Sequence, residues 1–387
     1  MQWMKRTWAK VSLDDLYHNY QQIRGHINSN AKFMGVVKAD AYGHGAIAIS
    51  RALTEFGADY LAVSNLEEAI QIRNTGIELP ILILGYTPPS FASELVYRNI
   101  TQAVYSLEYA QELSQALYGK KEFLPVHLKI DTGMARIGFL SYDCEETLQA
   151  AARVASLPGL MAEGIFTHFS SADSTAEDAI SFTQSQYKRF NHALDYLKGS
   201  GVEFQLRHCC NSGAIIQYPQ YAMDMVRAGI ITYGLPASAD LKYRLDLRPI
   251  MTLQTVVSHI KEIPKESPVG YSRTYKTPSA KRIATLPIGY ADGFSVALSG
   301  QVSVLLREKS YPVVGRICMD MCMIDITDAP EIQIGEIVTV VGPDNSWDYI
   351  ADLLQTIPYE VVCRISKRVP RVYTQNGDEV DVLRYIC

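Results

Sequence analysis

The chain has 387 residues, of which 48% are hydrophobic, and 36 Lys and Arg against 41 Asp and Glu give it a formal net charge of −5. This length predicts two domains, one of them of barrel size, and the hydrophobic fraction excludes a disordered chain. The chain is acidic overall and has no long Lys/Arg cluster, which argues against nucleic-acid and anionic-membrane partners. Its apolar runs are only as long as strands and no signal peptide is visible, so we expect a cytoplasmic protein.

Strand-like and helix-like patterns alternate over the first 230 residues. Eight short apolar runs are typical of strands buried on both faces, and they occupy residues 32–38, 59–64, 80–85, 101–106, 126–131, 160–168, 203–210 and 224–230. Apolar residues at helical spacing between these runs predict crossover helices. The pattern predicts an α/β fold, a (β/α)8 TIM-type barrel, with a doubly wound open sheet as the alternative.

The pattern changes after Leu247. Short strands punctuated by Pro and Gly are predicted at residues 251–260, 282–287, 301–306, 313–326 and 337–341, with one helix near 349–354. We therefore expect a C-terminal, mostly β domain. The expected limits are 10–240 for the barrel and 247–387 for the β-rich domain, and residues 1–9 are a candidate addition to the second.

Lys38 stands at the end of an apolar strand, in the segment KFMGVVKADAYGHG over residues 32–45. Barrel enzymes keep their chemistry at the carboxyl ends of the strands. Lysine is also the side chain that forms Schiff bases with carbonyl cofactors. Taken alone, a lysine in such a position is more often solvated than catalytic.

Other polar side chains and glycines occur at the ends of the predicted strands. They are Tyr42, Lys129, Asp131, Arg136, His168, Asn211, Ser212, Gly213, Arg227, Gly229 and Ile230. Ser212 opens a short predicted helix, whose free N–H groups favour anions, and Gly229 lets backbone approach a ligand closely. Each residue alone also fits an ordinary role as an ion-pair partner, a helix cap or a packing residue. Their joint occurrence favours a phosphate-bearing cofactor held by a lysine.

Long sequence motifs carry a resemblance to a known family. The segment KADAYGHG at residues 38–45 resembles the pyridoxal 5′-phosphate (PLP) lysine motif of the alanine racemase family. The matches continue in order with KIDTGMARIG (129–138), GIFTHFSSAD (164–173), HCCNSGAI (208–215), MVRAGIITYG (225–234), VGYSRTY (269–275), PIGYADGF (287–294), GRICMD (315–320) and IPYEVVCRISKRVPR (357–371). The resemblance covers nearly the whole chain, which is identified as a member of this family.

The resemblance implies a two-base racemase acting on a small substrate, alanine, to supply D-alanine for peptidoglycan. Lys38 binds PLP and acts as the base on the D-alanine face, and Tyr271, from the partner subunit of a head-to-tail homodimer, acts on the L-alanine face. His168 contacts this tyrosine. Arg227 faces the pyridine nitrogen and, because a guanidinium cannot accept a hydrogen bond, it should keep that nitrogen unprotonated and restrain transamination.

The remaining site residues also follow from the resemblance. Arg136 and the Met319 backbone hold the substrate carboxylate, and Lys129 matches a position that is carbamylated in some relatives. The phosphate contacts are Tyr42, Ser212, Gly229, Ile230 and Tyr359, and the supporting and entry residues are Asp173, Tyr290, Arg316 and Asp320. Tyr359 would crowd the substrate side chain and favour alanine over serine, although a pocket rejects an added hydroxyl only weakly.

Several alternatives stay open at this point. Tyr275 lies in the same segment as Tyr271 and is the other candidate for the base. A PLP-dependent decarboxylase is the rival within the fold, and a non-catalytic PLP carrier is the rival from another class. The seven cysteines show no paired CxxC spacing, which favours reduced thiols over a zinc site.

Overall fold

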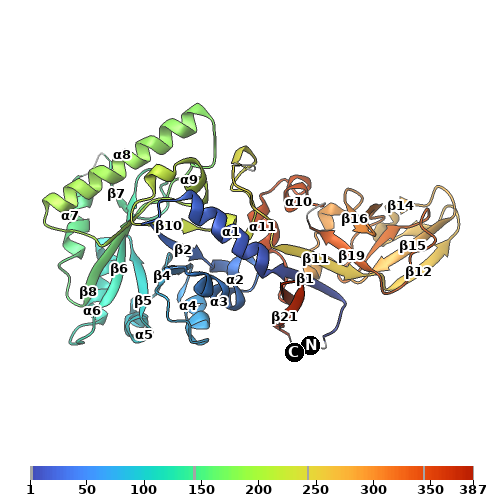
Figure 1. Ribbon diagram of the computed structural model, residues 1–387, viewed down its shortest axis with the longest axis horizontal. Coiled ribbons are helices and arrows are strands. Elements are labelled where there is room, and N and C mark those ends of the chain that lie inside the picture. The colour runs from blue at the N-terminus through green and yellow to red at the C-terminus, as the bar shows by residue number, and fades with distance from the viewer. Residues whose placement is uncertain (1–2, 143–144, 242–243, 343–344, 387) are drawn as a thin grey trace. The chain divides into compact units, whose positions relative to one another are not determined.

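The computed structural model describes residues 3–142, 145–241, 244–342 and 345–386. The chain forms two compact units (Figure 1), which we call the barrel unit, Tyr17–Ala41 and Ala46–Leu247, and the sheet unit, Met1–Leu16, Tyr42–Gly45 and Arg248–Cys387. Within the described ranges, no helix is long and apolar enough to cross a membrane. Each unit is described below by itself.

Parallel strands form the centre of the barrel unit. They are β2 (Lys32–Val36), β3 (Tyr60–Val63), β4 (Ile81–Ile83), β5 (Ile100–Val104), β6 (Leu124–Asp131), β8 (Leu160–Phe166), β9 (Leu206–His208) and β10 (Met225–Ala228). Their order in space is β10-β2-β3-β4-β5-β6-β8-β9, with the short β7 (Phe139–Leu140) beside β6. Each strand therefore neighbours the next along the chain, which confirms the barrel and excludes the doubly wound sheet.

Backbone hydrogen bonds join the two ends of this sheet. Asp224 N donates to Arg207 O at 3.0 Å, and Arg227 N donates to Cys210 O at 3.0 Å. The sheet is thus nearly closed between β9 and β10. Closure directs the carboxyl ends of all its strands toward one rim, where the predicted site residues of this unit lie.

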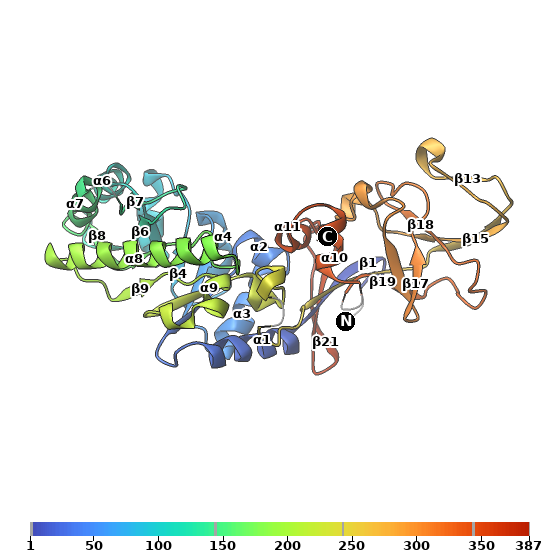
Figure 2. The same cartoon turned by 90° about the horizontal axis from the view of Figure 1, so that it is seen from above.

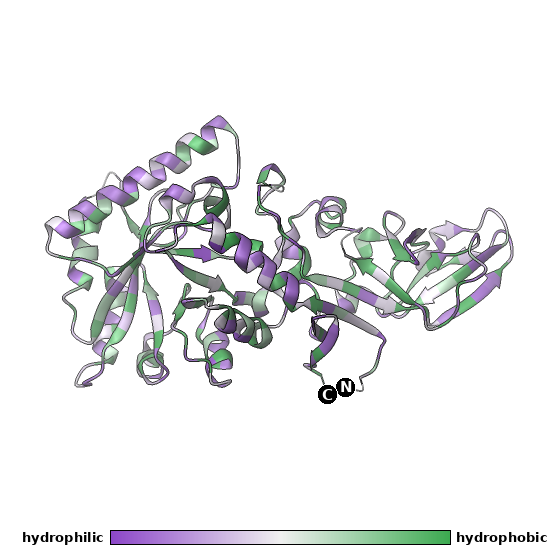
Figure 3. Cartoon of the chain, viewed as in Figure 1, coloured by the Kyte–Doolittle hydropathy of each residue, from purple (hydrophilic) through white to green (hydrophobic). Residues whose placement is uncertain are grey.

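Helices cover the outside of the strands and lie between them in the chain. They are α1 (Leu13–His26), α2 (Lys38–Tyr42), α3 (Ala46–Phe56), α4 (Leu66–Arg73), η1 (Pro89–Phe91), α5 (Ala92–Tyr97), α6 (Leu107–Ala116), α7 (Glu145–Val154), α8 (Glu177–Gly199), α9 (Ser212–Gln217), η2 (Pro219–Tyr221), η3 (Ile230–Tyr233) and η4 (Ala239–Leu241). Asn65 and Ser106 cap α4 and α6 by accepting from the backbone N–H three residues later. The long α8 interleaves hydrophilic and hydrophobic residues, as an amphipathic surface helix does (Figure 3).

The sheet unit is mostly β, as expected. Its seven-stranded sheet has the order β17-β16-β19-β11-β1-β20-β21. These strands are β1 (Thr7–Ser12), β11 (Met251–Val256), β16 (Ser303–Leu306), β17 (Lys309–Pro312), β19 (Ile337–Val341), β20 (Arg371–Gln375) and β21 (Asp378–Leu383). The N-terminal β1 lies in the middle, antiparallel to β11 and parallel to β20.

Smaller elements complete the sheet unit. A three-stranded sheet contains β12 (His259–Ile263), β15 (Lys281–Leu286) and β18 (Cys322–Asp325), and the hairpin of β13 (Pro268–Val269) and β14 (Tyr275–Lys276) lies beyond it (Figure 2). The helical elements are α10 (Trp347–Leu353), α11 (Pro358–Cys363), η5 (Tyr271–Arg273), η6 (Tyr290–Asp292) and η7 (Val296–Leu298). The helix expected near 349–354 is thus α10.

The predicted extent of two strands in this unit was wrong. The run 251–260 is two strands in different sheets, because Val257 N bonds to Glu336 O while Ser258 N bonds to Thr285 O. The run 313–326 keeps only β18 and a bridge at Val313. Gly315 explains the break: its φ is 70°, and a Cβ there would lie 2.6 Å from Val269 O. The chain leaves the sheet at this glycine and forms the loop that carries Met319.

Candidate active site

Lys38 follows β2 and begins a turn of unusual handedness. Residues 39 to 42 all have φ between 52° and 56°, the left-handed region that L-residues seldom occupy. Side-chain hydrogen bonds hold this turn: Ala39 N donates to Glu68 Oε1 at 2.7 Å, and Ala46 N donates to Asp40 Oδ1 at 2.8 Å. The turn ends the strand abruptly and leaves the half-buried Lys38 at the rim of the barrel.

Lys129, on β6, is a buried amine in a cationic environment. Its side chain is 4% exposed, its Nζ lies 4.9 Å from the centre of the Phe166 ring, and it forms no ion pair with any described residue. Burial, with the charges of Arg227 and Arg136, holds the pKa of Lys129 well below its usual range, and Asp131 offsets this only in part. The rim thus contains more positive charge than its own carboxylates neutralise, which favours an anionic ligand.

Arg227, on β10, is the central cation of this rim. Its Nη1 donates to His208 Nδ1 at 3.0 Å, and its Nη2 donates to Thr167 O at 2.8 Å and to His168 Nδ1 at 3.2 Å. Burial lowers the pKa of Arg227 to about 10, so it stays protonated at neutral pH. Among the residues that the structure describes, no carboxylate pairs with Arg227 and no acceptor bonds to its Nε–H, which leaves this donor for a bound group.

His168 is held as a neutral imidazole. Because Arg227 is always a donor, Nδ1 of His168 must accept, and the proton of the neutral ring is on Nε2. Burial and the charges of Arg227 and Lys129 lower the pKa of His168 well below its usual range. Asn211 Nδ2 lies 3.4 Å from Nε2, but it is itself a donor to Phe169 O. The Nε2–H of His168 therefore remains a donor for a further group.

Ser212 and Gly229 meet at the carboxyl ends of β9 and β10. Asn211 caps α9, which places Ser212 in its first turn, and Ser212 Oγ accepts from Gly229 N at 3.1 Å. Gly213 packs against the backbone of the loop after β8, since a Cβ there would lie 2.8 Å from Asp173 N. The predicted cradle residues Ser212, Gly229 and Ile230, together with Asp173, are thus brought together around backbone N–H groups.

Tyr42 and Tyr359 form a second group, in the sheet unit. Their ring centres are 6.1 Å apart, and burial raises the pKa of the Tyr42 phenol. The following glycine is fixed on both sides: Arg371 Nε donates to Gly43 O at 2.9 Å, and a Cβ on Gly43 would lie 2.5 Å from Val362 O. These contacts set the position of Tyr42 against α11.

The other predicted residues of the sheet unit lie on exposed loops. Tyr271 is 69% exposed and Met319 is 52% exposed. Tyr290 N donates to Cys318 O at 3.0 Å, which ties the Tyr290 turn to the Met319 loop. In the same loop, Arg316 Nη1 donates to Ser272 Oγ at 3.3 Å, and Asp320 pairs with Arg368 at 2.8 Å. The structure brings these residues together, although they come from three separate segments.

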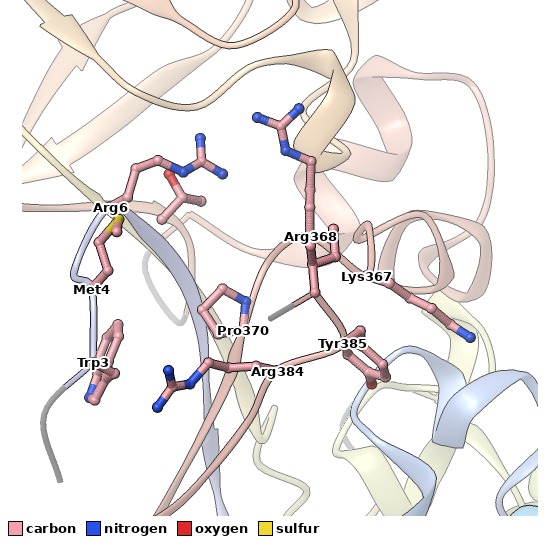
Figure 4. Close-up of a pocket in the computed structure, with 10 residues that line it drawn as sticks. Trp3, Met4, Arg6, Lys367, Arg368, Pro370, Arg384 and Tyr385 are labelled. Carbon is pink, nitrogen blue, oxygen red and sulfur yellow. The ribbon is translucent and has the colours of Figure 1, made fainter.

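A cavity of about 230 Å³ in the sheet unit contains none of the predicted site residues. In Figure 4, Arg6 and Arg368 lie at the top of the view, and Trp3 and Arg384 lie lower. Arg6 and Arg368 both pair with the buried Asp292, at 2.5 and 3.1 Å. Two of the three arginines that line this pocket, Arg6 and Arg368, therefore already serve a structural ion-pair network.

The sequence reasoning missed two histidines of the barrel interior, His127 and His208. Both are fully buried, and they contact each other through Nδ1 of His127 and Nε2 of His208 at 2.9 Å. Their sequence signal is a polar residue within an otherwise apolar strand run, which is rare unless the residue has a partner.

Two domain descriptions of one known family match this chain. The family description "Alanine racemase, N-terminal domain" matches residues 11–237, and "Alanine racemase, C-terminal domain" matches residues 250–373. The chain belongs to the alanine racemase family. The match to both domain descriptions confirms the expected family and class of enzyme, an amino-acid racemase, and does not favour a decarboxylase or a non-catalytic carrier of the barrel alone.

Individual members of the alanine racemase family are similar over the full length. Alanine racemase 1 of Clostridium acetobutylicum is 43% identical over 388 residues, covering 99% of each chain. The structure of alanine racemase from Clostridium difficile 630 has a TM-score of 0.95 at 40% identity and covers 100% of both chains. A second structure of that racemase, in complex with cycloserine, has a TM-score of 0.93 at 39% identity with the same coverage.

The structure describes five of the seven cysteines. Cys209, Cys210, Cys318 and Cys322 are thiols that form no disulfide, whereas Cys144 and Cys387 lie outside the described residues. In the described part of the chain, no group of three or more His, Cys, Asp or Glu side chains could hold a metal ion.

Proposed function

We propose that the chain interconverts L-alanine and D-alanine with PLP, acting in the cytoplasm as a head-to-tail homodimer that supplies D-alanine for peptidoglycan. Family membership and 43% identity to a full-length alanine racemase support this activity. The observation that carries the proposal is the rim of the barrel. There burial, with the charges of Arg227, Lys129, Arg136 and Lys38, lowers the pKa of His168, and this excess of cationic side chains fits an anionic cofactor and an anionic substrate.

The donor groups of the rim fit PLP. Arg227 has an Nε–H without an acceptor in the described structure, which suits the pyridine nitrogen. By the family resemblance, the proposed phosphate contacts are Tyr42, Ser212, Gly229, Ile230 and Tyr359. When bound, PLP withdraws electrons from the substrate Cα and makes its C–H bond acidic.

Two bases on opposite faces of Cα are needed for racemisation. We assign the D-alanine face to the amine of Lys38 and the L-alanine face to Tyr271 of the partner subunit. A phenol has an ordinary pKa near ~10, so Tyr271 needs stabilisation of its phenolate. The Nε2–H of neutral His168 can donate to that phenolate and lower its pKa.

Substrate binding and entry complete the proposed site. Arg136 and the Met319 N–H would hold the alanine carboxylate, while Asp173, Tyr290, Arg316 and Asp320 support or line the entry. Tyr359 would favour a methyl side chain over a larger one. We propose that residues 10–240 form the cofactor-binding domain and residues 247–387 the β-rich domain. Residues 1–9 are a candidate addition to the second.

The proposed dimer accounts for exposed apolar side chains on two touching loops. Tyr271, Met319 and Met321 are each about half exposed or more, and a Cβ on Gly270 would lie 3.1 Å from Arg316 N of the neighbouring loop. Clustered exposed apolar side chains of this kind are typical of a surface that a partner covers.

Arg227 provides a test of reaction specificity. Replacement by Glu would let the pyridine nitrogen carry a proton and so strengthen electron withdrawal, which would favour transfer of the alanine amino group to the cofactor with release of pyruvate. We therefore expect Arg227→Glu to release pyruvate from alanine at a rate at least about tenfold above the wild type, while racemisation falls. Arg227→Lys, which retains a cation, is the control. Unchanged pyruvate release in Arg227→Glu would refute this role.

The activity itself is tested with the PLP-loaded chain. L-alanine and D-alanine are supplied separately in D₂O, and chiral chromatography with mass spectrometry follows both enantiomers and α-deuterium incorporation. We expect deuterium in both enantiomers and none with Lys38→Ala. Loss of CO₂ would indicate a decarboxylase, and exchange of neither enantiomer would indicate a non-catalytic carrier.

A further inference from the structure

A line of polar groups runs through the interior of the barrel unit from the buried Arg227 to the half-buried Glu163. Arg227 Nη1 lies 3.0 Å from His208 Nδ1, and His208 Nε2 lies 2.9 Å from His127 Nδ1. His127 Nε2 lies 3.5 Å from Glu163 Oε2, whose carboxylate also accepts from Tyr60 Oη at 3.1 Å. The line starts at the proposed cofactor site and ends at a carboxylate near the opposite end of the strands.

The direction of every hydrogen bond in this line is determined. A guanidinium only donates, so His208 Nδ1 accepts and the neutral His208 ring carries its proton on Nε2. That proton is donated to His127 Nδ1, so neutral His127 in turn carries its proton on Nε2. The remaining proton faces Glu163 Oε2 at 3.5 Å, and His127 Nε2 has no closer hydrogen-bond partner among the described residues.

The backbone is shaped to accommodate this line. The pairing of β6 with β8 shifts register between Val126 and His127, and Glu163 is the extra residue on the β8 side of this bulge. Opposite it, a Cβ on Gly164 would lie 2.6 Å from the His127 ring, so only glycine leaves room. Both histidines are fully buried, and His208 stacks on Phe166 with ring centres 4.9 Å apart. Burial lowers the pKa of both rings and keeps them neutral.

We propose that His127 and Glu163 are positioning residues for the reaction, which fix the tautomer of His208 so that it accepts from Arg227 and holds the guanidinium in its catalytic orientation. This inference rests on the proposed function, because it concerns the group that faces the cofactor. Glu163 is the nearest acceptor that the described residues offer to His127 Nε2–H, and it therefore favours the same tautomers that the donation from Arg227 requires.

Loss of the Glu163 carboxylate has a defined consequence. Without the carboxylate, a proton on His127 Nε2 has no acceptor to which it can donate. His208 can then take the tautomer with the proton on Nδ1. That tautomer places two donors 3.0 Å apart, His208 Nδ1–H and Arg227 Nη1–H, which repel each other. Arg227 then moves, and its contact with the cofactor nitrogen weakens.

The test compares substitutions at one carboxylate. Glu163→Leu removes the acceptor, and Glu163→Gln keeps an amide oxygen that can accept from His127. Tyr60→Phe removes the other donor to the same carboxylate but keeps the aromatic ring beside His127 and the acceptor itself. The first readout is the tautomer of His127 and His208 in the full-length chain, with and without PLP, from two-bond ¹⁵N–¹H correlations of ¹⁵N-histidine protein. The second is the ratio of pyruvate release to racemisation of alanine.

We expect both rings as Nε2–H tautomers in the wild type, Glu163→Gln and Tyr60→Phe, and Nδ1–H at His208 in Glu163→Leu. In Glu163→Leu the kcat for racemisation should fall about tenfold with KM nearly unchanged, and the pyruvate ratio should rise. Wild-type tautomers in Glu163→Leu, or equal losses in Tyr60→Phe, would overturn the proposal. An inactive wild-type chain with the expected tautomers would overturn the proposed function instead.

Discussion

The fold disfavours the charged form of the Lys129 amine. Its pKa is held well below the value near ~10.4 of a solvated lysine, so the folded chain binds fewer protons here than the unfolded chain between these two pKa values. This group therefore makes stability rise with pH across that window, and its charged form costs most below it. A neutral amine is also the form that adds CO₂, and the resulting carbamate is an anion that can pair with Arg136.

We therefore predict that Lys129 is carbamylated. With ¹³C-bicarbonate at about pH 8, where the neutral amine and dissolved CO₂ coexist, we expect a carbamate ¹³C resonance that is absent in Lys129→Gln. Bicarbonate should also raise the melting temperature of the wild type and not that of the variant, and the effect should weaken toward about pH 6. Electron density for a bare ammonium, or the same resonance in Lys129→Gln, would contradict the prediction.

The two tyrosines of the 269–275 segment differ in environment. Tyr275 packs against the buried cluster of Val269, Ile283 and Val314, whereas Tyr271 is 69% exposed. We predict that Tyr271→Phe lowers L-to-D turnover by about 10³-fold without changing the unfolding midpoint. Tyr275→Phe should instead keep most activity and shift only stability. Turnover in both directions, measured with thermal unfolding, distinguishes them, and a reversed pattern would assign the base to Tyr275.

At the scale of elements, the sequence predicts what is encoded locally. The barrel strands were correctly placed because each is a mostly buried apolar run followed by a segment of helical periodicity, in some cases with a cap such as Asn65. The strand β1 was not predicted, because its partners β11 and β20 lie more than 200 residues away and its pattern is too short to indicate them. Pairing over that distance is a property of the whole chain.

The site was predictable in part for the same reason. Lys38, Ser212 and Arg227 stand at strand ends, which periodicity identifies. Tyr271 and Met319 lie on loops whose geometry depends on glycine packing, and only the family resemblance indicated them. The left-handed turn after Lys38 could not be predicted from the sequence. Alanine and aspartate have no local preference for this conformation, and tertiary contacts impose it.

Gly43 is the test of those tertiary contacts. Alanine at Gly43 would have a positive φ and a Cβ 2.5 Å from Val362 O, whereas alanine at Gly76 would have the same handedness with nothing within 4 Å. We predict that Gly76→Ala costs about 1 kcal/mol and Gly43→Ala at least about 3 kcal/mol of unfolding free energy. Urea unfolding measures the free energy of unfolding of both variants. Equal losses would show that the backbone near Val362 moves aside at little cost.

At the scale of the whole molecule, the proposed sharing of sites between subunits has a quantitative consequence. Lys38→Ala and Tyr271→Phe are each expected to be inactive as homodimers. Random mixing of the two gives about half heterodimers, and in each of these one site carries both substitutions while the other is intact. We therefore predict recovery of about a quarter of wild-type activity on co-expression.

The matched control pairs two substitutions of the same unit. Lys38→Ala with Arg227→Ala leaves no intact site in any heterodimer, because both residues belong to the barrel unit. Co-expression of this pair should recover no activity. Recovery with both pairs, or with neither, would contradict the shared site, and analytical ultracentrifugation of the mixtures confirms that heterodimers form.

The central position of β1 also determines the order in which the chain can be assembled during synthesis. The ribosome makes Thr7–Ser12 first, but its two neighbours, Met251–Val256 and Arg371–Gln375, emerge only after the barrel strands have left the exit tunnel. This first strand must therefore remain unpaired through most of translation, while the barrel folds from sequential neighbours. The seven-stranded sheet is completed last, so a ribosome that stops before Arg371 releases a chain with an open edge at β1.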